Sequence, residues 1–125
     1  MCNRHFRAMA FVICLSISRP APADCADADV EAAFHRQDIP ALRHIIDDDL
    51  AQPALGPIAA AVLGLAAYRA AILLKKNSQG SDAQSLIAQV ADGIDPIRAK
   101  TRDADVTALM SMLYGLEIAL SPVRG

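Results

Sequence analysis

The segment from Ile58 to Leu74 restricts the fold of this chain more than any other. It is 17 residues long and carries a single charge, on Arg69. A helix that is apolar nearly all round needs packing partners on several sides, so we predict a central helix from Ile58 to about Lys75. Pro57 suits its opening position. The alternative is a membrane span, but the segment is shorter than the roughly 20 residues that cross a bilayer. We therefore expect no membrane contact.

The N-terminus has the order of elements of an export signal. Arg4 and Arg7 precede the apolar run AMAFVICLSIS, and the small-residue sequence Ala21–Pro22–Ala23 follows it. We predict a signal peptide over residues 1–23, with cleavage after Ala23, and a periplasmic or secreted protein. The apolar run of 11 residues is too short for an anchor that spans the membrane.

Cleavage there changes the charge and the thiol content of the chain. Residues 1–23 hold three of the 12 basic residues and none of the 14 acidic ones, so the mature chain has nine against 14 and a net charge of −5. The basic residues are scattered, and we expect no nucleic-acid binding. Cys2 and Cys14 leave with the signal peptide, so the mature chain keeps only Cys25 and closes no internal disulfide. An inert thiol and an acyl anchor at Cys25 both stay open.

The pattern after the signal predicts an N-terminal helical pair over residues 24–56. We expect residues 24–29 to be flexible and a short helix to run from Val30 to about Gln37, because apolar positions then recur at helical spacing. Asp38 ahead of Ile39–Pro40 is typical of a helix start. The apolar side of this second helix carries Leu42, Ile45, Ile46 and Leu50.

Residues 57–125 are predicted to form a helical hairpin and a final helix. The sequence NSQGSD indicates a turn, and Ser81 with Gln84 matches a capping box, so the next helix should start after Ser81. Asp95–Pro96 predicts its stop or a kink. Its buried stripe is Leu86, Ile87, Val90, Ala91 and Ile94.

The final helix is predicted to start at a cap on Asp103 or Asp105 and to end at Ser121–Pro122. Its apolar stripe is Val106, Leu109, Met110, Leu113, Leu116 and Leu120, with Glu117 set within it. No alternating run of β-branched residues suggests a strand. The predicted class is all-α, as a small array of helical hairpins or a bundle.

Residues 57–122 resemble a divergent tetratricopeptide repeat. The resemblance lies in LGLAAYRAA, with Leu63–Gly64 and a tyrosine soon after, followed across a turn by DAQSLIAQVADGIDP. It implies that Gly64 lets two helices approach closely, that Pro96 ends the second helix, and that Gly115–Leu116 begins a second unit. Gly64 and Pro96 are 32 residues apart, where the standard repeat leaves about 24. The resemblance therefore implies an insertion at NSQGSD.

Candidate chemical groups are few. His44 and Asp48 share a helix face and offer two ligands to a divalent metal, but His35 lies on another helix and a metal needs three or four ligands. The run Asp47–Asp49 lacks the spacing and the glycine of a calcium loop. We predict that both stretches are solvated surface and that the chain binds no metal or cofactor.

Arg69 and Glu117 are the two charges set among apolar neighbours on helices that should pack together. They either form a structural ion pair or reach solvent separately along their stems. The five serines after residue 77 lack the strand-turn-helix setting of a nucleophile, and Tyr68 and Tyr114 suit the core or its rim. We therefore expect no enzymatic activity and no catalytic residue.

The leading functional hypothesis is an exported, non-enzymatic helical module or scaffold that binds another protein, with self-association as one possibility. Two alternatives stay open. One is a carrier of a small hydrophobic ligand in a cavity between alanine-rich helices. The other is an accessory protein anchored in a membrane by residues 58–74.

Overall fold

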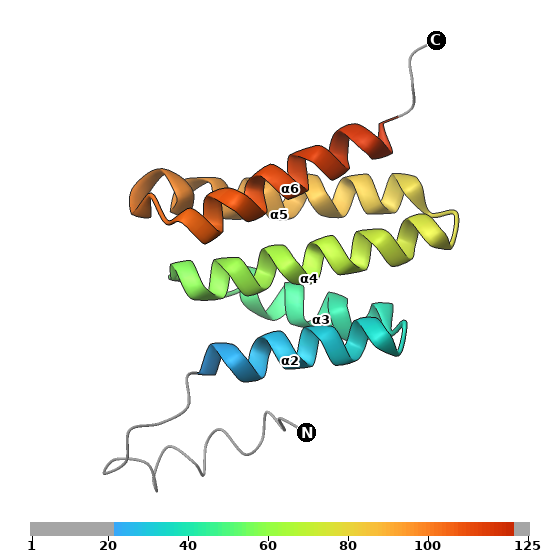
Figure 1. Cartoon of the computed structure of the whole chain (residues 1–125), viewed down its shortest axis with the longest axis horizontal. Helices are drawn as coiled ribbons and strands as arrows, with labels where there is room; N and C mark the ends of the chain where they lie inside the picture. The colour runs from blue at the N-terminus through green and yellow to red at the C-terminus, as the bar shows by residue number, and fades with distance from the viewer. Residues whose placement is uncertain (1–21, 122–125) are drawn as a thin grey trace, which may run out of the picture.

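A computed structural model of the chain describes residues 22–121, which form five helices and no strand. These are α2 (Pro22–His35), α3 (Ile39–Leu50), α4 (Pro57–Lys76), α5 (Gly80–Thr101) and α6 (Ala104–Leu120) (Figure 1). The all-α class is confirmed. The predicted signal peptide, residues 1–23, lies almost entirely outside the described part of the chain.

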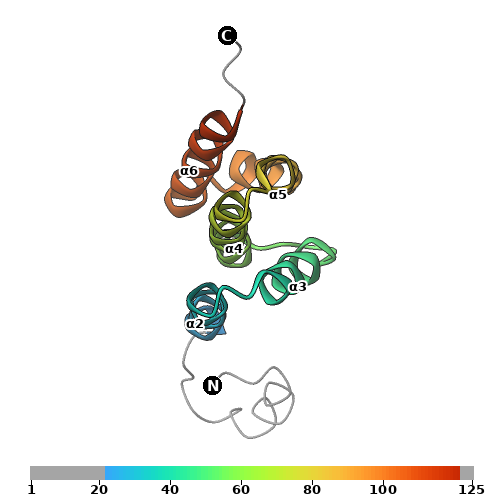
Figure 2. The ribbon, with the colours of Figure 1, turned by 90° about the vertical axis from the view of Figure 1, so that its right-hand side faces the viewer.

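Helix α4 is the centre of the molecule. It contacts each of the other four helices, with α2 and α6 on opposite sides of it (Figure 2). Helices α2, α4 and α6 run in one direction, and α3 and α5, which connect them, run in the opposite direction (Figure 1). The prediction of a central helix packed on several sides is confirmed. Four of its residues are at most 1% exposed: Ala60, Leu63, Ala67 and Leu74.

Side-chain caps and prolines define the starts of three helices. The Oδ1 atom of Asp38 accepts a hydrogen bond from the amide of Ala41 at 3.0 Å and caps α3. Pro57 opens α4. The Oδ1 atom of Asp103 accepts bonds from the amides of Asp105 and Val106 at 2.9 and 3.1 Å and caps α6. The sequence analysis predicted the positions of Asp38 and Pro57 and left the cap of α6 open between Asp103 and Asp105. Helix α6 ends before Ser121 as expected.

Helix α2 is longer than the sequence pattern predicted. Residues 24–29 are helical, so the prediction of a flexible segment is wrong. Ala26 packs against the core ahead of Val30 and Ala33, which extends the same apolar stripe by one turn towards the N-terminus. Aspartates in the early turns also favour the positive end of the helix dipole.

Helix α5 differs from the prediction at both ends. It begins at Gly80 with Gln79 in the N-cap position and no side-chain cap, so the capping box at Ser81 is not formed. It also continues through Pro96 to Thr101 instead of stopping there. Ile94 is fully buried before the proline and Ile97 packs against the core after it. Tertiary packing on both sides of Pro96 therefore outweighs the local cost of a proline within a helix.

Helices α2 and α4 end in the same backbone motif. After α2, the amides of Gln37 and Asp38 bond to the carbonyls of Phe34 and Ala33, and after α4 the amides of Ser78 and Gln79 bond to those of Lys75 and Leu74. Gln37 and Ser78 have φ of 55° and 62°. This is the Schellman motif, in which one left-handed residue reverses the chain. The chain therefore reverses direction by the same turn in the hairpins α2–α3 and α4–α5.

Candidate functional site

Helix α6 carries most of the large apolar surface that the described residues leave uncovered. Four large hydrophobic side chains are exposed in this part of the chain, and three of them belong to α6: Met112 at 43%, Tyr114 at 42% and Ile118 at 76%. The fourth is Ile58 at the start of α4, at 64%. Apolar side chains grouped on one element, unlike scattered ones, mark an interaction surface.

The inner side of α6 is already occupied. Val106, Met110 and Leu113 are buried, and α6 contacts α4 and α5. Gly64 of α4 marks how closely these helices approach, because a Cβ atom there would lie 3.4 Å from both Ile94 Cδ1 of α5 and Leu109 Cβ of α6. The predicted role of Gly64 in close helix packing is thus consistent with this geometry.

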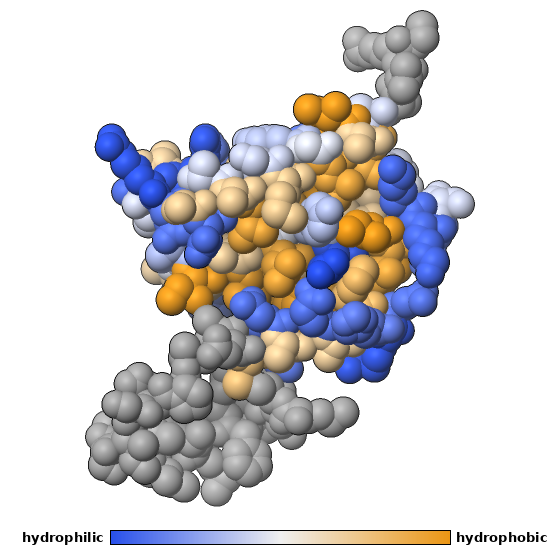
Figure 3. Space-filling view, in the orientation of Figure 1, coloured by the Kyte–Doolittle hydropathy of each residue, from blue (hydrophilic) through white to orange (hydrophobic). Residues whose placement is uncertain are grey.

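The outer side of α6 has a second row of small and apolar residues. Its members recur at intervals of four, three and four: Ala108, Met112, Gly115 and Ala119. All four are exposed, and a Cβ atom built on Gly115 would meet nothing within 4 Å. We define the outer face of α6 as this row together with Tyr114 and Ile118, the other two exposed large side chains of the helix. Figure 3 shows apolar surface along α4 and α6, bordered by hydrophilic residues.

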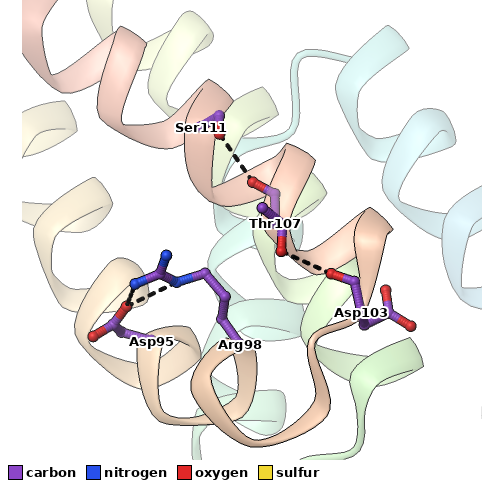
Figure 4. A network of polar contacts seen from close by, with 5 residues as sticks. All are labelled: Asp95, Arg98, Asp103, Thr107 and Ser111. Carbon is purple, nitrogen blue, oxygen red and sulfur yellow. Dashed lines mark hydrogen bonds and ion pairs between the residues drawn. The ribbon is translucent and has the colours of Figure 1, made fainter.

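The hydroxyl groups on the exposed side of α6 are bonded within the helix. Thr107 Oγ1 donates to the carbonyl of Asp103 at 2.8 Å, and Ser111 Oγ donates to the carbonyl of Thr107 at 3.0 Å (Figure 4). Ser121 Oγ donates in the same way to the carbonyl of Glu117 at 3.0 Å. These donors therefore need no water, and covering them carries little of the usual penalty for burying a polar group.

Several charged residues lie in and around the turn between α5 and α6. Arg98 pairs with Asp95 on the same helix, with Nη2 2.7 Å from Oδ1 (Figure 4). Lys100 and Arg102 are exposed just before α6 begins. From Val106 to Leu116 α6 carries no charged residue. The outer face is thus uncharged along most of its length. Its N-terminal end has charges of both signs, Lys100 and Arg102 beside Asp103 and Asp105, and Glu117 lies near its C-terminal end.

Arg69 has a partner that the sequence analysis did not identify. Its Nε lies 2.9 Å from Oε1 of Glu31 on α2, and its guanidinium carbon lies 4.4 Å from the centre of the Phe34 ring. The expected alternatives, a pair with Glu117 or separate exposure to solvent, are both wrong for Arg69. Glu31 stands 38 residues away in sequence, so no local spacing indicates the pair.

The histidines and aspartates of α2 and α3 do not converge on one point. His44 Nε2 lies 3.6 Å from Asp48 Oδ2, with both side chains well exposed, while His35 stacks at a tilt against Phe34. Among residues 22–121, the structure brings no three His, Cys, Asp or Glu side chains within reach of one ion. Asp47 is exposed and lies in the last turns of α3.

Cys25 is disulfide-bonded in the full-length chain. Cys2 and Cys14, the other two cysteines of the sequence, fall outside the described residues. The expectation of a single thiol concerns the chain after cleavage and stays a prediction. Tyr68 is half-buried against the core, whereas Tyr114 is exposed.

Comparison with models of protein families, with curated proteins and with solved structures finds no match for this chain. The sequence analysis identified the inner stripe of α6 and missed the outer face. The signal was present in the row from Ala108 to Ala119, which follows the same helical spacing on the opposite side.

Proposed function

We propose that this chain is a non-enzymatic helical module that binds a protein through the outer face of α6. The observation that carries the proposal is the concentration of exposed large hydrophobic side chains on that one helix, Met112, Tyr114 and Ile118. Burial of apolar surface drives most protein association, and solvent-exposed apolar groups of this size gather where a partner covers them.

We further propose that the helices form a short repeat array of the tetratricopeptide type. Helix α4 packs on the hairpin α2–α3 and is covered by α5, and α6 packs on the hairpin α4–α5 in turn. The shared ends of α2 and α4 and the close approach at Gly64 support this arrangement. Pro96 does not fit, because α5 runs past it to Thr101. The repeat therefore differs from the family pattern at the position where its second helix should end.

Export to the periplasm or beyond the cell is part of the proposal. It rests on the basic, apolar and small-residue order of residues 1–23, and on the acidic mature chain that their removal leaves. The predicted cleavage point after Ala23 falls in the first turn of α2. N-terminal sequencing of the protein from the extracytoplasmic fraction tests this part directly.

A membrane-anchored accessory protein is the second candidate, and α4 is the observation that favours it. Within residues 22–121, α4 is the one helix with the length and apolar composition to cross a bilayer. More than half of its apolar stretch is buried by the other helices, however, as in the core helix of a water-soluble protein. Carbonate extraction separates the two: recovery of the protein in the membrane pellet would contradict the soluble module.

The experiment that tests the binding function compares matched surface variants. The full chain is expressed with an affinity tag in its source cells, as wild type, as Ile118→Gln and as Ile58→Gln. Both positions are exposed aliphatic residues, on α6 and on α4 respectively. We expect Ile118→Gln to lose a partner, which can be a second copy, that Ile58→Gln retains. Identical bound proteins for all three chains would disprove the proposed surface.

A further inference from the structure

We draw no further inference here: the strongest candidate, the exposed apolar outer face of α6 with Met112, Tyr114 and Ile118, belongs to the surface already proposed to bind a protein, and nothing in the structure shows what covers it.

Discussion

Arg69 and Glu31 join α4 to α2 through two hydrogen bonds, from Nε to Oε1 at 2.9 Å and from Nη2 to Oε2 at 3.2 Å. The guanidinium also lies over the ring of Phe34. Both side chains of the ion pair are about 30% exposed, so the pair is partly shielded from solvent. Helix α2 is thereby held by a polar contact as well as by Val30 and Ala33.

Substitution Arg69→Met should destabilise the chain moderately. Methionine keeps the apolar stem but removes both bonds to Glu31 and the stacking on Phe34, and we expect a loss of about 1 kcal/mol in the free energy of unfolding. Urea denaturation at neutral pH measures it. In a double-mutant cycle, Arg69→Met should couple with Glu31→Gln and be additive with Glu117→Gln. Coupling with Glu117 in place of Glu31 would contradict the structure.

The partner of Arg69 shows where sequence reasoning reaches its limit in this chain. Helical periodicity predicted the buried stripes of α5 and α6, because the residues of one helix face recur at fixed intervals in the sequence. Caps at Asp38 and Asp103 were equally local. A contact such as Arg69 with Glu31 depends on how two helices pack, and no spacing along either helix records it.

Pro96 and the outer face of α6 show two further limits. A proline inside a helix has a local free-energy cost, and this cost is what the sequence pattern indicates. In the folded chain, the burial of Ile94 near Pro96 outweighs it. The sequence analysis missed the outer face because α6 is apolar on two sides. It recognised only the more hydrophobic stripe, from Val106 to Leu120, as a packing face. Only the packing of α4 and α5 decides which of the two stripes is covered.

Gly64 should tolerate alanine but not a larger side chain. An added Cβ would make contacts of 3.4 Å with Ile94 and Leu109, close to ordinary van der Waals distance. Alanine gains up to about 1 kcal/mol of helix propensity, so we expect Gly64→Ala to be at least as stable as the wild type. Gly64→Leu overpacks the contact of three helices and should lose about 1 to 3 kcal/mol. Thermal unfolding compares the two, and equal stability of Gly64→Leu would contradict this packing.

Replacement of Pro96 should stabilise α5. The helix continues through this exposed position, where proline lacks the amide that would bond to the preceding turn. We expect Pro96→Ala to raise the free energy of unfolding by about 1 to 3 kcal/mol. Urea denaturation measures the gain, and hydrogen exchange should show slower exchange from Ile97 to Thr101. No change in either measurement would indicate that the helix ends before the proline.

Alanine substitutions at Asp103 and at Ser81 should have different effects on stability. Asp103→Ala removes both bonds to the amides of Asp105 and Val106, and we expect it to cost about 1 kcal/mol. Ser81 lies inside α5 and caps nothing. Ser81→Ala, the matched control, should leave the urea midpoint nearly unchanged. A loss of stability in Ser81→Ala as large as that in Asp103→Ala would indicate that Ser81 forms the capping box that the sequence pattern predicted.

Ser78 should be improved by glycine. Its φ of 62° lies in the left-handed region, which costs a side-chain-bearing residue about 1 kcal/mol relative to glycine. Ser78→Gly should therefore raise the thermal midpoint, because it keeps the bonds from residues 78 and 79 to the carbonyls of Lys75 and Leu74. Gln79, with φ of −105°, is the control. Gln79→Gly gains no such relief and increases the entropy of the unfolded chain, so it should lower the midpoint. The opposite order of the two variants would show that the chain does not reverse through a left-handed residue at Ser78.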